Sequence, residues 1–463
     1  MAFPELTVTV QDDRHVRIAQ HDGAEAFGSL ELGALHQNLI GLFQDWLNQG
    51  KISERRELEI FGALLYQALF RGEVEMLFDK ALDRLASDEH LRVQLSFQEE
   101  AAGLARLPWE FLYRPDTETR RGFFLATSKD LALSRYLPLQ TGRQATLAPE
   151  KGPLRVLVAV TATEKPAETA AQPVIATIQK LSSKLPIAVE VLNEPTLENF
   201  LDKLDEIRPH VLHFITQSQL LADAKESQIA LLEPDGKSIK WVTDKDFADL
   251  FVEMGAIPRL IFLQGSGGGA VDFKAGFAGM APQLIRAEAQ AVVAMQGAIS
   301  HAAATTFSTR FYWELLRGAP VDQAVQSARG RIKAIADAEN VLVKDFGLPV
   351  LYMRSRTGII QPSPVPTPEI LDEAQALQAE IFDVYEAGLK QLLAQIGKDH
   401  PRYDEALVYE QRLTENIALY RSAGDTETRR AERAEIISYL NTLARTALGV
   451  TFNEMCQRVR REG

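Results

Sequence analysis

"HVLHFITQS", at residues 210–218, has the pattern of an apolar strand that ends in small or polar residues, and "RLIFLQGSGGG", at 259–269, has the same pattern. Both belong to a series of short apolar runs that alternate with helical patterns between 153 and 355: "LRVLVAV", "IAVEVL", "VLHFI", "RLIFL", "AVVAM" and "PVLYM". Strands that alternate with helices predict an α/β fold with a mostly parallel, helix-covered sheet. Sites form where the strands of such sheets end, and Gln217 and Ser266 both occupy that position.

The C-terminal part of the sequence has a different pattern. Prolines recur every second residue from Pro362 to Pro368, which favours an extended spacer. Apolar residues then keep steps of three or four, as in a buried helical stripe, which predicts an all-α bundle of about four helices. The N-terminal region, with alternating strands and amphipathic helices, is expected to pack on the α/β domain. The chain thus divides into four ranges: N-terminal region 1–150, α/β domain 151–358, Pro-rich linker 359–367 and helical bundle 368–463.

Composition limits the classes of function. The 463 residues include 50 basic and 63 acidic side chains, and the formal charge of −13 argues against nucleic acid and anionic membranes as partners. No run is long enough to span a bilayer and no signal peptide is evident, so we expect a cytoplasmic protein. The single cysteine, Cys456, excludes an internal disulfide and a Cys-based metal site, and we expect neither a metal nor a cofactor.

Three phrases carry a family resemblance. They are "LPWEFLYRP" at 107–115, "GFFLATSKDLALSRYLPL" at 122–139 and the long stretch from "GFAGMAPQLIRAEAQ" to "VDQAVQSARGRI" at 276–332. In this order and at this separation they resemble the CHAT domain, a caspase-like cysteine peptidase module common in bacteria. The resemblance implies a caspase-like sheet flanked by helices, a bacterial source, and a region 1–150 that forms the N-terminal part of the CHAT region.

The resemblance also places a catalytic pair. In active CHAT peptidases the strand corresponding to "VLHFI" is followed by His and Gly, and the strand corresponding to "RLIFL" by the nucleophilic Cys. These positions hold Gln217, Ser218 and Ser266. A glutamine cannot exchange a proton near neutral pH, and a serine without a base is a poor nucleophile. The sequence therefore predicts a pseudoprotease with no catalytic residue.

Other side chains are weaker candidates for a rescued site. His213 lies on the strand that precedes Gln217, where a buried, hydrogen-bonded role is favoured, and His301 lies at the start of a predicted helix, where a surface or capping role is the default. Of these, His301 is the better candidate. Cys456 lies on an apolar helix face and is expected to be part of a core.

Two other functions stay open. The first is an active CHAT-type peptidase that uses Ser266, either natural or engineered from Cys, although Gln217 would then require a second replacement. The second is a nucleotide-binding regulator, because Gly265, Gly267 and Ala270 have the spacing of a dinucleotide-binding loop. No clear helix follows that loop, which weakens this interpretation.

The resemblance implies a role in binding once the catalytic pair is absent. We expect an adaptor, a regulatory subunit or a substrate in a bacterial caspase-like signalling or antiphage defence system. The helices at 436–456 are similar to small adaptor modules, so the expected partner is an active caspase-like protease or effector with a matching helical module, with a homo-oligomer as the alternative. If the chain is itself cleaved, the loops at 140–152 and 421–428 are the first sites to examine.

Overall fold

The computed structural model divides the chain into two compact units. Unit 1 comprises residues 1–333 and 343–364, and unit 2 comprises 334–342 and 365–463. The structure describes the following residues: 4–52, 54–86, 89–118, 120–137, 152–161, 165–182, 186–221, 226–265, 279–297, 299–339, 344–355, 357–360, 385–423 and 427–456. The predicted linker, from residue 361 on, and most of the loop at 140–152 lie outside them.

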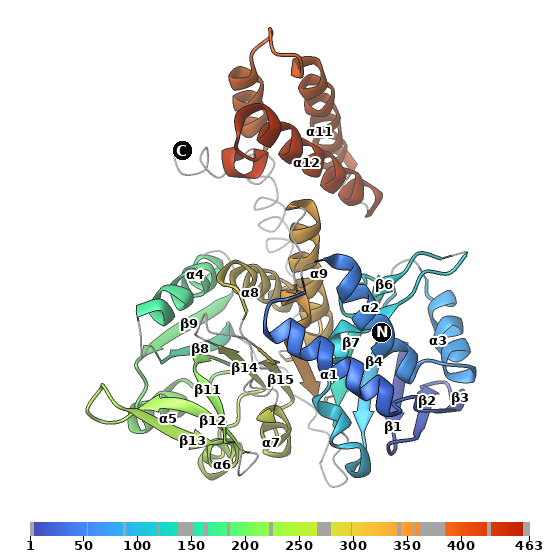
Figure 1. The fold of residues 1–463 in the computed structure, drawn as a ribbon. Helices are drawn as coiled ribbons and strands as arrows, with labels where there is room; N and C mark the ends of the chain where they lie inside the picture. Colours follow the sequence, from blue (N-terminus) through green and yellow to red (C-terminus); the bar gives the residue numbers. More distant parts are fainter. Residues whose placement is uncertain are drawn as a thin grey trace. The chain divides into compact units, whose positions relative to one another are not determined.

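Unit 1 is built on one large sheet (Figure 1), with 11 strands in the order β3-β2-β1-β4-β7-β16-β15-β14-β10-β8-β9. The pairs β1–β2, β2–β3 and β15–β16 are antiparallel and the other pairs are parallel, which confirms the predicted mostly parallel α/β fold. The strands are β1 Glu5–Val10, β2 His15–Gln20, β3 Glu25–Ser29, β4 Leu91–Phe97, β7 Leu131–Tyr136, β8 Leu154–Val160, β9 Ile187–Asn193, β10 Val211–Thr216, β14 Leu260–Gly265, β15 Ala291–Met295 and β16 Pro349–Met353.

Helices cover both faces of the sheet. The step from β8 to β9 runs outward and the step from β9 to β10 runs back across β8, so right-handed crossovers place α4 and α5 on opposite faces. α8 packs with α4, and α6 packs with α7. Figure 1 shows α4 and α8 above the sheet and α5, α6 and α7 below it. Their bounds are α4 Lys165–Ser182, α5 Leu197–Ile207, α6 Asp244–Met254, α7 Ala281–Arg286, α8 His301–Leu316 and α9 Val321–Glu339.

The N-terminal region extends the same sheet, where packing as a neighbour had been expected. Its strand β7 pairs with β16, with Arg135 opposite Tyr352. Its helices are α1 Ala34–Asn48, α2 Arg55–Leu69 and α3 Glu73–Asp83. Short elements complete unit 1: β5 Tyr113–Arg114, β6 Phe123–Phe124, β11 Ser218–Leu221, β12 Glu226–Leu232, β13 Ile239–Thr243, and the 3₁₀ turns Glu99–Ala101, Leu104–Arg106, Trp109–Phe111, Leu125–Thr127 and Asp345–Gly347.

A buried polar network ties the N-terminal region to the rest of unit 1. Glu110, in the LPWE phrase, is 1% exposed and accepts two hydrogen bonds from Arg135, which is 2% exposed. Gln296, which directly follows β15, donates a hydrogen bond of 3.0 Å to the same carboxylate. The hydroxyl of Tyr352 lies 3.1 Å from Nη1 of Arg135. One polar network therefore joins three segments that are distant in sequence.

Helix α9 contributes a second polar connection. Asp322, Gln326 and Arg329 are spaced by four and three residues, so they share one helix face, and all three are buried. Asp322 lies 2.7 Å from Nε of Arg92, Gln326 donates to the carbonyl of Leu125, and Arg329 donates to main-chain carbonyls of β7 and β16. Because each of these side chains has a hydrogen-bonding partner, the helix can carry charged residues inside the core.

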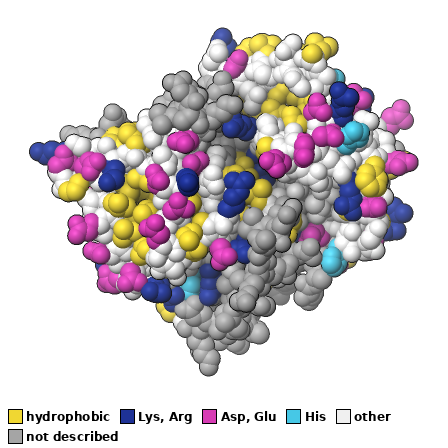
Figure 2. Space-filling model, turned by 90° about the horizontal axis from the view of Figure 1, so that it is seen from below, with side chains coloured by type: hydrophobic (Ala, Val, Ile, Leu, Met, Phe, Trp, Pro, Cys, Tyr) yellow, Lys and Arg dark blue, Asp and Glu magenta, His cyan; other side chains and the backbone are white. Residues whose placement is uncertain are grey.

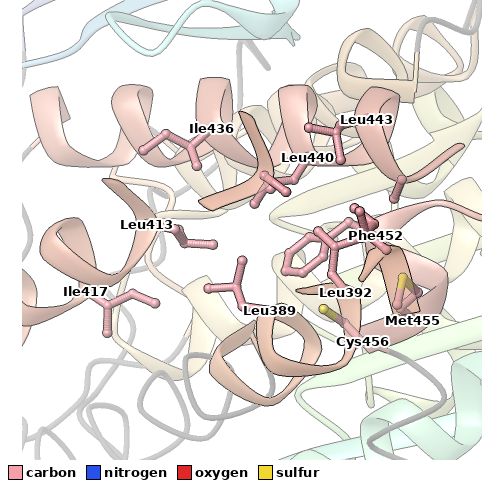
Figure 3. Packing of buried hydrophobic residues seen from close by; sticks show 13 residues of the cluster. Leu389, Leu392, Leu413, Ile417, Ile436, Leu440, Leu443, Phe452, Met455 and Cys456 are labelled. Atoms are coloured by element: carbon pink, nitrogen blue, oxygen red, sulfur yellow. The ribbon is translucent and has the colours of Figure 1, made fainter. Parts of the chain in front are cut away.

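Unit 2 is an all-α unit with its own core (Figure 3), which confirms the predicted C-terminal helical fold in the described part. α11 spans Tyr403–Ala423 and α12 spans Glu427–Leu448, and residues 385–396 and 452–456 are also helical. The cluster combines residues from all four segments: Leu389, Leu392, Ile396, Ala406, Leu413, Ile417, Ile436, Leu440, Leu443, Ala444, Phe452, Met455 and Cys456.

The surface of unit 1 has mixed charge. Figure 2 shows its lower face, where acidic and basic side chains lie beside one another around apolar ones. Among the described residues, no helix is both long enough and apolar enough to cross a membrane.

Candidate peptidase site

The two strands that should carry the catalytic pair are neighbours in the sheet. β10 and β14 run parallel, and Thr216, the last residue of β10, is the partner of Gly265, the last residue of β14. Gln217 follows the first of these residues directly, and Ser266 follows the second in sequence. Because Thr216 and Gly265 are partners, β10 and β14 end side by side at the same edge of the sheet. Ser266 itself lies outside the described residues.

The main chain at Gln217 is held by a neighbouring strand. Its carbonyl accepts a hydrogen bond from the amide of Ala230 at 3.1 Å. The carbonyl of Ala230 in turn accepts from the hydroxyls of Thr216, at 2.8 Å, and Thr161, at 3.0 Å. Ser218 begins β11 and pairs with Ile229. The position at which the family resemblance predicts a glycine in an active enzyme is therefore part of an ordinary strand here.

The residues at or just after the carboxyl ends of β8, β10, β14 and β15 are neutral. Thr161 follows β8, Gln217 follows β10, Gln264 lies near the end of β14 and Gln296 follows β15. Amide and hydroxyl side chains donate and accept hydrogen bonds but do not titrate near neutral pH. At these described positions the edge can therefore bind polar groups, and it offers no general acid or base.

His213 is buried inside the sheet. Its Nε2 donates to Oε1 of Gln264 at 3.1 Å, its Nδ1 accepts from the hydroxyl of Tyr312 at 3.2 Å, and its ring stacks on Phe262. Burial lowers the pKa of His213 to about 3, so the ring is neutral at physiological pH. Four residues of strand also separate it from Gln217 by about 13 Å. These contacts give His213 the buried, hydrogen-bonded role that the sequence favoured.

The other two candidates lie in ordinary structural positions. His301 is the exposed first residue of α8, and the helix is capped by the preceding Ser300, whose hydroxyl accepts from the amide of Ala303. Cys456 is 4% exposed in the core of unit 2, as expected, and burial raises the pKa of its thiol to about 12. A thiol with this pKa is not deprotonated at neutral pH and is not a nucleophile.

The lowered pKa of His213 predicts a pH-dependent stability. In the unfolded chain His213 binds a proton below about pH 6.5, whereas in the folded chain it does so only at about pH 3. The stability that depends on neutral His213 is therefore complete above pH 6.5 and is lost as the pH falls toward 3. Between these pH values, the protonation of His213 should lower the free energy of unfolding by about 1.4 kcal/mol for each unit by which the pH falls.

Urea unfolding at several pH values between 4 and 7 measures this slope. In His213→Gln the slope should decrease by the contribution of one proton, whereas His301→Gln, a change at an exposed histidine, should leave it unchanged. Equal slopes in the wild type and His213→Gln would show that His213 titrates normally in the folded protein.

The family assignment agrees with this geometry. The CHAT domain model matches residues 59–341, which is more than half of the chain. The chain belongs to the CHAT domain family. The match runs from within α2 to just beyond α9 and so spans β10, β14 and the positions 217 and 266. The CHAT-domain membership implied by the LPWE phrase and the closing segment is thus confirmed.

Solved structures give a more distant similarity. The chain is similar to separase in two crystal structures of the Saccharomyces cerevisiae separase–securin complex, with 11% identity and a TM-score of 0.42 in one and 12% and 0.39 in the other. Each match covers 76% of this chain and 30% of the other, so the chain spans less than a third of the protein it matches. No curated protein sequence matches the chain.

Some features of the site were not anticipated from the sequence. The hydroxyls of Thr161 and Thr216 converge on one carbonyl, and β11 to β13 form a small antiparallel sheet directly after Gln217. The short apolar run "IALL", residues 229–232, was the available signal for this sheet. Apart from Gly265, the proposed nucleotide-binding loop lies outside the described residues. Among the described residues, no group of three or more His, Cys, Asp or Glu side chains is placed to hold a metal ion.

Proposed function

We propose that this CHAT-family protein is a pseudoprotease that binds other proteins and does not cut them. The observation that carries the proposal is the pair of neighbouring strands, β10 and β14, whose following residues are Gln217 and Ser266. The chemistry of a cysteine peptidase requires a thiolate and an imidazole that moves a proton to the leaving amine. Neither group is present at these two positions.

The surroundings of the site support the same conclusion. A serine nucleophile at 266 would need a base within hydrogen-bond reach. The described side chains at the ends of β8, β10, β14 and β15 are amides and hydroxyls, and His213 is buried and neutral. The main chain of Gln217 is bound to Ala230, so the segment that would carry a catalytic histidine is part of a hydrogen-bonded ladder.

Unit 2 supports a role as an adaptor. It has its own buried core, as Figure 3 shows, and several large apolar side chains of its helices remain exposed, including Val408 at 56% and Leu407 at 44%. Next to them, Tyr409 and Tyr439 stack with ring centroids 3.8 Å apart. Contiguous exposed apolar surface marks binding sites, and tyrosine is enriched among the residues that contribute most to protein interfaces. In the proposed role, unit 2 pairs with a similar helical module of an active caspase-like protease in bacterial signalling or antiphage defence.

A peptide-library cleavage assay on four purified full-length forms tests the loss of activity. The forms are the native protein, Ser266→Ala, Ser266→Cys, and Ser266→Cys combined with Gln217→His. We expect no cleavage by the first three forms, because each lacks at least one member of the pair, and slow cleavage by the fourth. Cleavage by the native protein that disappears in Ser266→Ala would overturn the proposal and identify a serine peptidase.

A further inference from the structure

Within the part of the chain that the structure describes, the outer strand β9 presents an unpaired edge. β9 is the last strand of the large sheet and pairs only with β8 among the described residues. Figure 1 shows it at the border of unit 1, beside α4. The site proposed above lies at the carboxyl ends of β10 and β14, so this edge is a separate surface of the same sheet.

The hydrogen bonds to β8 show which main-chain groups face outward. The amide of Glu194 donates to Val160, and the carbonyl of Pro186 accepts from Leu154. In a strand, the N–H and C=O of one residue point to the same side and successive residues alternate. The even-numbered residues of β9 therefore face β8, and Ile187, Val189, Val191 and Asn193 direct their N–H and C=O groups away from the sheet.

β9 has little of the usual protection of a sheet edge. Proteins shield edge strands with proline, charged side chains (lysine above all), bulges or very short length, and β9 has one charged side chain, Glu190. The seven residues of β9 read "IAVEVLN", contain neither proline nor lysine, and pair with β8 in continuous register from Ile187 to Asn193. The strand at the opposite edge, β3, has only 5 residues. A long regular edge is a template for another strand.

The exposed charges of the edge indicate the chemistry of its partner. Glu190 is exposed in the middle of β9, and Glu194 is exposed just after it. A strand that binds here gains from basic side chains opposite Glu190, because oppositely charged cross-strand pairs stabilise a sheet. A second copy of this chain would bring another Glu190 and a formal charge of −13 to the same edge, so a basic segment of a different protein fits it better.

We propose that β9 binds an extended segment of a partner protein in which β-branched and basic residues alternate, and that this segment adds a strand to the large sheet. The main-chain groups of Ile187, Val189, Val191 and Asn193 supply the affinity, and Glu190 selects for basic residues. This interaction does not depend on the state of the peptidase site or on unit 2.

The alternation of β9 allows a sharp test with the full-length protein. Val191→Pro removes an outward N–H and keeps every hydrogen bond to β8. Val191→Thr keeps the outward N–H as well as the hydrogen bonds to β8 and serves as the matched control. The probe is a fluorescein-labelled peptide of alternating Val and Lys, long enough to span β9, and its affinity is measured by fluorescence anisotropy. A peptide of alternating Val and Glu tests the role of charge.

We expect the wild type and Val191→Thr to bind the Val/Lys peptide, and we expect Val191→Pro to bind it at least tenfold more weakly. The Val/Glu peptide should also bind the wild type at least tenfold more weakly. Equal affinity of Val191→Pro and the wild type, or no binding by the wild type, would overturn the proposal. A wild-type dimer that Val191→Pro dissociates would overturn the choice of a basic partner in favour of a second copy.

Amide hydrogen exchange of the wild type provides a test that needs no variant. Before the peptide is added, the amides of Ala188, Glu190 and Leu192 should exchange slowly, because they bond to β8, and those of Val189 and Val191 should exchange fast. The peptide should slow the second group selectively. Protection that does not alternate along β9 would contradict the proposed pairing.

Discussion

Replacing Glu110 with alanine should lower the free energy of unfolding of unit 1 by about 3–5 kcal/mol. The side chains of Glu110 and Arg135 are 2% and 3% exposed, and they are joined by hydrogen bonds of 3.0 and 2.7 Å. Removal of the carboxylate leaves the guanidinium of Arg135 buried without its counter-ion. It also removes an acceptor from the amide of Gln296 at the end of β15. Both effects act in the same direction.

The surface ion pair between Arg17 and Glu25 provides the control. Their side chains are 43% and 44% exposed at a distance of 2.6 Å, so Glu25→Ala should change the stability by no more than about 1 kcal/mol. Urea unfolding followed by circular dichroism measures both variants. A Glu110→Ala protein as stable as Glu25→Ala would mean that the buried pair contributes little and that packing around Trp109 holds the N-terminal region. Glu110→Gln separates charge from shape, because it keeps a hydrogen-bonding group of the same size.

This network gives a physical reason for the phrases that identify the family. LPWE supplies Glu110, the following strand supplies Arg135, and the closing segment supplies Gln296. A buried polar group requires a specific hydrogen-bonding partner, whereas an apolar core residue can often be replaced by another apolar residue of similar volume. Polar residues in these phrases are therefore more informative about the fold than the apolar residues around them.

The sequence predicted the elements better than their order. Apolar runs with turn residues between them indicated the strands of the α/β domain, and the helical stripes beyond residue 368 indicated unit 2. The alternation in "ELTVTV" and "LRVQLSF" indicated strands in the N-terminal region too, but it could not show that they join the same sheet. The two groups of strands are connected where β7 pairs with β16, with Arg135 opposite Tyr352. These two residues are distant in sequence, and nothing in the sequence around either one indicates the other.

The candidate site was predictable in position and less so in detail. Strand ends in a parallel sheet locate Gln217 because the carboxyl edge is where such sites form. The burial of His213 followed from its place within an apolar strand. The hydroxyl groups of Thr161 and Thr216 could not be assigned in advance, since their shared acceptor, Ala230, comes from a strand outside the large sheet.

Replacing Phe452 with alanine should destabilise unit 2 by about 3–5 kcal/mol. Its ring is fully buried, and it lies among Leu392, Met455 and Cys456 in Figure 3. It also stacks on Tyr385, and a methyl group added at Gly388 would lie 3.3 Å from it. Because the surroundings are closely packed, the space left by the ring would remain largely empty. Val408→Ala, at a side chain that is 56% exposed on α11, is the control and should change the stability by no more than about 0.5 kcal/mol.

Differential scanning calorimetry of the full chain measures this effect and tests the division into two units at the same time. Each unit has its own buried core, so each should contribute its own unfolding transition. Phe452→Ala should lower the midpoint of one transition and leave the other in place, and Glu110→Ala should do the reverse. A single transition that both variants lower together would show that the two cores unfold as one. In that case a partner that binds unit 2 would stabilise the whole chain, because ligand binding to the folded state stabilises everything that unfolds with it.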